Sequence, residues 1–373
     1  MSESPSGLRI IVTGTRGFPN VQGGVEAHCE HLYPLLVQLG CDVTVITRQT
    51  YVDPSLKEHK GVKLYPLRNP REKSLEAIVH TFKAVFKAKQ LGCDILHIHA
   101  VGPALMVPVA RMLGLKVVMT NHGPDYDRQK WGGFAKVMLR LGEYCGSKGA
   151  HKVISISRPI ADSLKHKYNC DAEIIPNGVV IPEIAETDKV LKQFGLEKWK
   201  YILAVGRFVP EKGFHDLLDG FAKTQKESWK LVIAGDADHE DQYSLNLKMK
   251  ANRVQNVVLT GFQKGQSLQE LFSHAGLFIL PSYHEGLPIV LLEAMSYGLS
   301  CIVSDIPANR EVDLDESRYF KPGDIDGLSA KIREFIEKPL GAKERERQIE
   351  YIRKNFDWET IAEETLKVYK RLY

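Results

Sequence analysis

The chain has 373 residues, of which 43% are hydrophobic and 26% charged, and its formal net charge at pH 7 is +4. This length predicts two domains rather than one, and the composition is that of a globular protein, which excludes a disordered or fibrous chain. No apolar run approaches the roughly 20 residues that span a bilayer, and no signal peptide is evident at the start. The six cysteines have no metal-ligand spacing, so we expect a cytoplasmic protein with reduced thiols and no structural zinc.

Short β-branched runs alternate with amphipathic segments along the whole chain. We predict strands at 8–13, 42–48, 62–67, 94–99, 116–120, 152–157 and 173–176 in the first half, and at 201–206, 230–235, 257–261, 277–282 and 300–305 in the second. Such alternation favours parallel sheets that are covered by helices on both faces.

The alternation restarts after a polar stretch at 176–189, which reads as a linker between domains. The sequence therefore predicts an α/β protein with two doubly wound, Rossmann-like domains, at 1–180 and 181–357. A last helix at 358–373 is expected to pack back on the first domain. In sheets of this kind, ligands bind at the carboxyl ends of the strands.

Charge is distributed unevenly between the two halves. Residues 1–180 contain 23 Lys and Arg against 15 Asp and Glu, whereas the remainder contains 27 against 31. A basic first half suits an anionic partner such as a lipid diphosphate or a membrane surface. Because the lysines are interspersed rather than clustered, an ordinary solvated surface is the alternative to a site for an anionic partner. We expect no nucleic-acid partner.

One predicted helix, at 74–90, has two interpretations, which are packing in the core and contact with a membrane. It places Ile78, Phe82 and Phe86 at helical spacing with lysines on the neighbouring faces. Packing of this apolar stripe in the core is the favoured interpretation, and contact with anionic lipid is the alternative.

Two glycines, Gly23 and Gly24, follow the first predicted strand and precede a helix that begins near Val25. Glycine lets backbone N–H groups approach a phosphate, and the start of a helix adds partial positive charge. The dinucleotide spacing G-x-G-x-x-G is absent. The segment predicts a phosphate contact, with a plain turn as the alternative.

Two cations follow the strand at 201–206. Arg207 and Lys212, in G-R-F-V-P-E-K-G, lie at its carboxyl end, where they can neutralise a diphosphate. A solvated turn position is the alternative for Lys212.

The most informative stretch is P-S-Y-H-E-G-L-P-I-V-L-L-E-A-M-S-Y-G at 281–298. A strand leads into a turn, and Pro288 then stands in the first turn of a helix. Leu287, Pro288 and Ile289 stand at the helix start and are expected to bind an anion, because the backbone N–H groups of Leu287, Ile289 and Val290 would be unpaired there.

Two glutamates in the same stretch, Glu285 and Glu293, are separated by seven residues. Glu293 stands among apolar neighbours and needs a partner, either ribose hydroxyls or a cation. The pattern E-x7-E resembles the signature of retaining glycosyltransferases of family four, which have the GT-B fold. Three further motifs resemble the same family in the same order, at 23–26 (G-G-V-E), 175–179 (I-P-N-G-V) and 206–213 (G-R-x-x-x-x-K-G).

The resemblance implies roles for the residues identified so far. It implies two domains that face each other across a cleft. Glu285 would hold hydroxyls of the donor sugar and Glu293 the ribose. Arg207 and Lys212 would hold the diphosphate and stabilise the leaving group, and the turn at 23–24 would contact the diphosphate.

The segment T-N-H-G-P-D-Y-D-R-Q-K-W at 120–131 contains four further candidate site residues. His122 matches the active-site histidine of the family, which lies beside the donor sugar. Asp125, Arg128 and Lys130 resemble a pattern in polysaccharide-assembling bacterial members. The resemblance implies that these three face the acceptor, and a solvated charged loop is the alternative.

The implied activity is transfer of a sugar, with retention, from a nucleoside-diphosphate sugar, expected to be UDP-linked. The expected acceptor is a glycan, a polyprenyl-diphosphate-linked chain or a small hydroxyl compound, in cell-surface polysaccharide synthesis at the inner membrane face. We expect no metal cofactor, because cations take its place. Two alternatives are a nucleotide-sugar epimerase and a non-catalytic nucleotide-sugar-binding regulator.

Overall fold

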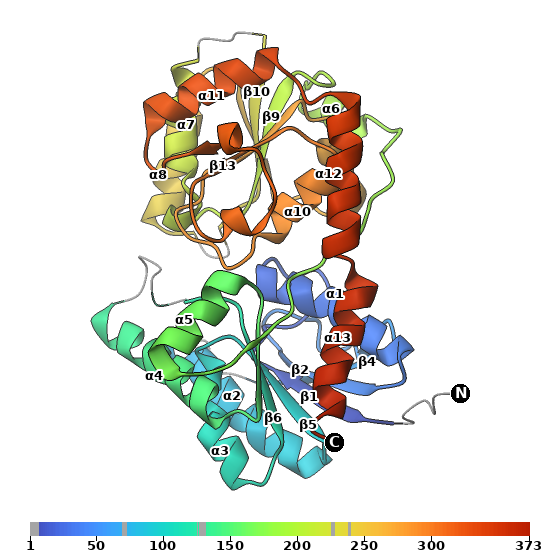
Figure 1. Ribbon diagram of the computed structural model, residues 1–373. Helices are drawn as coiled ribbons and strands as arrows, with labels where there is room; N and C mark the ends of the chain where they lie inside the picture. The colour runs from blue at the N-terminus through green and yellow to red at the C-terminus, as the bar shows by residue number, and fades with distance from the viewer. Residues whose placement is uncertain (1–6, 69–72, 125, 127–131, 225–227, 238–239) are drawn as a thin grey trace. The chain divides into compact units, whose positions relative to one another are not determined.

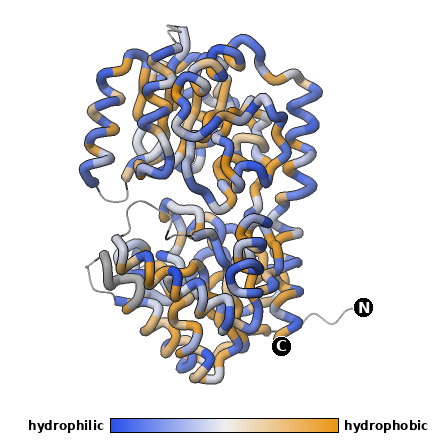
Figure 2. The backbone as a smooth tube through the Cα atoms, turned by 60° about the vertical axis from the view of Figure 1, so that its left-hand side comes forward, coloured by the Kyte–Doolittle hydropathy of each residue, from blue (hydrophilic) through white to orange (hydrophobic). Residues whose placement is uncertain are grey.

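The computed structural model describes residues 7–68, 73–124, 126, 132–224, 228–237 and 240–373, without the side chains of 73–78. The chain divides into two compact units (Figure 1). The first contains Met1–Gly178 and Trp358–Tyr373, and the second contains Val179–Asp357. In each unit, hydrophobic stretches run through the interior and hydrophilic stretches lie outside (Figure 2).

The described part of the first unit has an eight-stranded sheet in the order β3-β4-β2-β1-β5-β6-β7-β8, and only β3 is antiparallel to its neighbour. The strands are β1 (Arg9–Thr13), β2 (Asp42–Arg48), β3 (Glu58–His59), β4 (Val62–Leu67), β5 (Ile95–His99), β6 (Val117–Asn121), β7 (Lys152–Ser155) and β8 (Glu173–Ile174). The strand order reverses between β1 and β5, which is where ligands bind in open parallel sheets.

Two helical layers cover this sheet. Helices α1 (Gly24–Gln38) and α13 (Trp358–Lys370) share one core with β1, β2 and β4, which includes Tyr33 and Tyr369. The other face carries α2 (Lys73–Leu91), η1 (Pro103–Met106) and α3 (Val107–Met112), while α4 (Gly133–Gly149) and α5 (Arg158–Tyr168) follow β6 and β7.

The expectation that Phe82 and Phe86 pack in the core is wrong. They are 48% and 45% exposed, and their rings pair with each other at 4.9 Å. The helix instead buries Ala84, Val85 and Ala88. The stripe of small side chains therefore faces the core, and the large aromatic rings face outward.

The described part of the second unit has a six-stranded parallel sheet in the order β11-β10-β9-β12-β13-β14. Its strands are β9 (Tyr201–Val205), β10 (Lys230–Ala234), β11 (Val257–Gly261), β12 (Leu277–Leu280), β13 (Cys301–Ser304) and β14 (Tyr319–Phe320). Its helices are α6 (Lys189–Gln193), α7 (Phe214–Ala222), α8 (Gln242–Ala251), α9 (Gly265–Ser273), α10 (Ile289–Ser296), α11 (Ile325–Glu337) and α12 (Ala342–Asn355). The order reverses between β9 and β12.

Both sheets are therefore of the doubly wound, Rossmann-like kind that the sequence predicts, and this prediction is confirmed. The strand-order reversals place the ends of β1 and β5 in one unit, and of β9 and β12 in the other, where a ligand is expected.

Candidate functional site

In the second unit, the loop after β9 meets the end of β12. Arg207, two residues after the end of β9, is partly exposed, and Lys212 ends the short helix η3 (Pro210–Lys212). Gly213 has φ 66°, and a Cβ there would lie 2.1 Å from the carbonyl oxygen of Pro281. Glycine is thus required for the loop to reach the end of β12.

This close approach forms an ion pair between Lys212 and Glu285. The Nζ of Lys212 donates to Oε1 of Glu285 at 2.6 Å, and the side chains are only 16% and 11% exposed. The Ser282 hydroxyl donates to the same oxygen at 2.6 Å. Burial alone would raise the pKa of Glu285, but the charge and hydrogen bond of Lys212 and the bond from Ser282 lower it below its usual value. Glu285 is therefore ionised.

Behind Glu285, a chain of hydrogen bonds fixes its turn. The Ser304 hydroxyl, at the end of β13, donates to the carbonyl of Ser282. The Asn309 amide donates to the carbonyl and the hydroxyl of Ser304, at 2.9 and 3.1 Å. Sequence reasoning missed these positions, because their bonds join strands that are separated in the chain.

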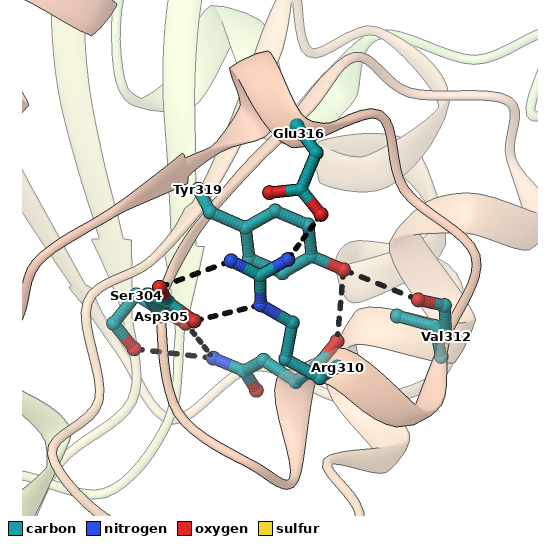
Figure 3. A network of polar contacts seen from close by, with 7 residues as sticks. Ser304, Asp305, Arg310, Val312, Glu316 and Tyr319 are labelled. Carbon is teal, nitrogen blue, oxygen red and sulfur yellow. Dashed lines mark hydrogen bonds and ion pairs between the residues drawn. The ribbon is translucent and has the colours of Figure 1, made fainter.

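The loop that carries Asn309 is itself held by Arg310 (Figure 3). Its guanidinium donates to Asp305 at 2.7 Å, pairs with Glu316, and stacks 3.9 Å from the ring centre of Tyr319. The loop after β13 thus holds Asn309 and, through it, the hydrogen bonds behind Glu285 in place.

Helix α10 begins at Ile289, with Pro288 as its N-cap residue and Leu287 buried before it. The helix thus starts just after the proline, which precedes its first turn rather than standing in it. Within the described residues, no backbone acceptor is recorded for the N–H groups of Ile289 and Val290. These groups carry the positive end of the helix dipole and can meet an anion.

Glu293 lies further along the same helix and is partly exposed between the buried residues Leu292 and Ala294. In the described part of the chain, its carboxyl has no recorded hydrogen bond or ion pair, so the salt-bridge alternative finds no partner there. Burial raises the pKa of Glu293 to about 7. The two glutamates of the motif therefore lie in opposite electrostatic environments.

In the first unit, the two glycines precede α1. Gly23 has φ 152°, and a Cβ there would lie 2.1 Å from a carboxylate oxygen of Glu26, whereas Gly24 faces open space. Glu26 is buried and accepts from Nε of Arg16 at 3.1 Å. Burial would raise the pKa of Glu26, but Arg16 lowers it. Sequence reasoning missed this ion pair, which fixes the turn.

Three histidines gather at the ends of β5 and β6. His99 ends β5, His122 follows β6, and Nδ1 of His99 lies 2.9 Å from Nε2 of His122. His28, on α1, lies edge-on to both rings, with centroids 5.5 and 5.0 Å away. Burial lowers the pKa of His28 and of His122 to about 3, and it lowers that of His99 well below its usual value. All three are neutral near pH 7. Sequence reasoning found only His122.

These histidines also form a group whose ligand atoms lie within 4.8 Å of one another, close enough to consider a metal ion. Two nitrogens around tetrahedral zinc lie about 3.3 Å apart, given Zn–N bonds of about 2.05 Å. His99 and His122 approach more closely, at 2.9 Å, and Nδ1 of His28 is bonded to Asn177 at 2.9 Å. The geometry fits a hydrogen-bonded cluster better than a metal site.

Asp125, Arg128 and Lys130, which the sequence predicts on the acceptor side, lie outside the described residues. Tyr126, between them, is buried, and its hydroxyl donates to Glu143 at 2.8 Å.

Comparison with known proteins covers both units. The model of glycosyl transferases group 1 matches residues 186–355, and that of Glycosyltransferase Family 4 matches residues 22–181. An uncharacterised glycosyltransferase of Methanocaldococcus jannaschii is 28% identical, with 94% of this chain and 95% of the relative covered. A UDP-Gal:alpha-D-GlcNAc-diphosphoundecaprenol alpha-1,3-galactosyltransferase of Escherichia coli is 27% identical, with 72% of each covered. The structure of HepE from Anabaena in complex with UDP and glucose superposes with a TM-score of 0.80, at 18% identity over 97% of this chain and 99% of that chain.

Proposed function

Because the chain belongs to glycosyltransferase family 4 and has the GT-B fold, we propose that it transfers a sugar, with retention, from a UDP-linked donor to a hydroxyl acceptor. The observation that carries this proposal is the ion pair of Lys212 and Glu285, preformed where the strand order of the second sheet reverses. The choice of UDP rests on HepE, whose structure contains that nucleotide.

The proposed mechanism follows from charge. Cleavage of the bond between the anomeric carbon and the diphosphate oxygen develops negative charge on the leaving group. Arg207, Lys212 and the N–H groups at the start of α10 meet this charge, and they do so without a metal ion. The Glu285 carboxylate accepts hydrogen bonds from sugar hydroxyls, and Glu293 accepts them from the ribose. The acceptor attacks from the face that the leaving group vacates.

In the first unit, His122 contacts the donor sugar, and the turn at Gly23 and Gly24 contacts the diphosphate. An epimerase would need acid and base carboxylates beside His122. The ring contacts recorded for His122 in the described residues are with His28 and His99, which favours transfer over epimerisation. A regulator without turnover has no need of the leaving-group cations.

For the acceptor, we propose a glycan or a polyprenyl-diphosphate-linked chain in surface polysaccharide synthesis. This rests on the Escherichia coli relative, whose name specifies a diphosphoundecaprenol acceptor. Asp125, Arg128 and Lys130 are the proposed acceptor-side residues.

Such an acceptor lies at a membrane, although no helix in the described part of the chain is long and apolar enough to cross one. We propose that the first unit contacts the inner membrane face through α2, where Phe82 and Phe86 are exposed and each is followed by a lysine, Lys83 or Lys87. Helix α4 adds exposed apolar residues at helical spacing, which are Phe134, Val137, Leu141 and Tyr144.

A donor screen tests the proposal. Purified protein is melted with UDP-, GDP- and TDP-linked sugars, and a ligand at 100 times its dissociation constant should stabilise the protein by about 2.7 kcal/mol. Donors that stabilise are then assayed for transfer to a lipid-linked acceptor and for the anomeric configuration of the product. If no nucleotide sugar stabilises the chain, or the product is inverted, the proposal fails.

A further inference from the structure

A continuous chain of buried side chains leads from the last helix to His122. The hydroxyl of Tyr369, on α13, lies 2.5 Å from Nδ1 of His97. Tyr33, on α1, contacts Nδ1 of His97 at 3.1 Å and also Nε2 of His99. Nδ1 of His99 then lies 2.9 Å from Nε2 of His122. The first four members are completely buried, so water does not interrupt the chain.

We propose that Tyr33 and His99 are positioning residues that hold His122 as the Nδ1–H tautomer, so that His122 donates a hydrogen bond to the donor sugar. This inference rests on the proposed function for the role of His122 toward the sugar. The tautomer itself is a property of the protein alone.

The tautomer follows from counting protons. A neutral imidazole has one N–H donor and one nitrogen acceptor. Tyr33 has one hydroxyl proton and three acceptors in reach, which are ring nitrogens of His97 and His99 and the hydroxyl of Tyr369. Nδ1 of His97 lies closer to the hydroxyl of Tyr369 than to that of Tyr33, and the shortest recorded contact of Tyr33 is with Nε2 of His99, so we assign the proton of Tyr33 to that nitrogen.

The other assignments follow in order from this one. Because Nε2 of His99 accepts, its Nδ1 carries the proton and donates to Nε2 of His122. His122 therefore carries its own proton on Nδ1, for which no hydrogen-bond partner is recorded among the described residues. The neutral state of each ring is favoured by burial, which lowers the pKa of His97 and His122 to about 3. A donor at Nδ1 can meet a sugar oxygen but cannot remove a proton from the acceptor.

Long-range 1H–15N NMR on 15N-histidine protein distinguishes the two tautomers, with His122→Ala assigning the signal. We expect the Nδ1–H pattern in the wild type and a change toward Nε2–H in Tyr33→Phe, which removes only the hydroxyl. Transfer by Tyr33→Phe should fall about tenfold in kcat/KM, the effect of one lost hydrogen bond in the transition state.

Tyr201→Phe is the matched control, since Tyr201 is a fully buried tyrosine of the second unit whose hydroxyl donates to the Leu271 carbonyl. It should lower stability similarly but change neither the His122 signal nor turnover. An Nε2–H pattern in the wild type, or an unchanged pattern in Tyr33→Phe, would overturn the tautomer assignment. The expected pattern together with normal turnover in His122→Ala would instead overturn the role of His122 toward the sugar.

Discussion

The two glutamates of the E-x7-E pattern should respond to pH with opposite signs, and Glu293→Gln is the substitution that reveals this. Burial raises the pKa of Glu293 from its ordinary value of 4.5 to about 7. Each tenfold difference in proton affinity corresponds to about 1.4 kcal/mol, so above pH 7 the ionised carboxylate costs the fold about 3 kcal/mol. A group with a raised pKa stabilises the fold fully below its unfolded pKa and loses this contribution as pH rises toward the folded value.

Glutamine cannot ionise, so the variant escapes this cost. We expect Glu293→Gln to be more stable than the wild type without ligand, with an advantage that grows by about 2 kcal/mol between roughly pH 5.5 and pH 8. Urea unfolding at both pH values measures it. If the wild type and the variant show the same pH dependence of unfolding, the reasoning about Glu293 is refuted.

Glu285→Gln is the matched control with the opposite sign. Burial would raise the pKa of Glu285, but Lys212 lowers it below its ordinary value. The ionised Glu285 therefore stabilises the fold above the ordinary pKa, and this contribution is lost as the pH falls through the lowered pKa. Removing the carboxylate leaves the Lys212 charge buried, and breaking such a pair costs about 3 kcal/mol. We therefore expect Glu285→Gln to be less stable than the wild type at neutral pH, with a difference that shrinks in acid.

The pH dependence of ligand binding gives a second test of the raised pKa of Glu293. Ribose hydroxyls that donate to the carboxylate favour its ionised form and lower its pKa in the complex. Binding of UDP to the wild type should therefore strengthen as the pH rises toward 7, and calorimetry should show that Glu293→Gln has lost this dependence. In kinetics, Glu293→Gln should mainly raise KM for the donor, whereas Glu285→Gln should mainly lower kcat. A well-folded Glu285→Gln enzyme with normal kcat would contradict the assignment.

Three further outcomes test the rest of the site. Arg207→Ala or Lys212→Ala should lower turnover by roughly 10²–10³, as for other transition-state charge stabilisers, and normal turnover would remove that residue from the mechanism. Transfer should survive EDTA, and loss of activity that Mg²⁺ or Mn²⁺ restores would contradict the metal-free mechanism. Binding to anionic liposomes should weaken steeply as salt rises and fall in the double variant Phe82→Ser and Phe86→Ser, and binding that ignores both changes would exclude α2 as the contact.

The sequence predicted what local patterns encode. Alternating runs indicated both parallel sheets, and motif spacing identified Lys212 and Glu285, which the structure joins in one ion pair. It did not identify His99 as a neighbour of His122, or Tyr33 as a neighbour of His99, because these contacts join α1 to the ends of β5 and β6, which lie far along the chain.

The exposed aromatic stripe of α2 was mispredicted for a related reason. Hydrophobic spacing alone cannot distinguish a core stripe from an outward-facing one, and on α2 the alanines around Val85 occupy the buried side. Which side of α2 is buried depends on how the helix packs on the rest of the unit, which is a tertiary property.

The course of the chain through its two units has a consequence for biosynthesis. The first unit is completed by α13, whose residues from Trp358 to Tyr369 enter the core beside Tyr33, while the second unit is built from Val179–Asp357 alone. During translation, where domains fold as units, the second unit therefore has its whole sequence before the first does. The apolar surface of the first unit that α13 covers therefore stays exposed until that helix has been synthesised, and a nascent chain that stops at Asp357 should present this surface to chaperones.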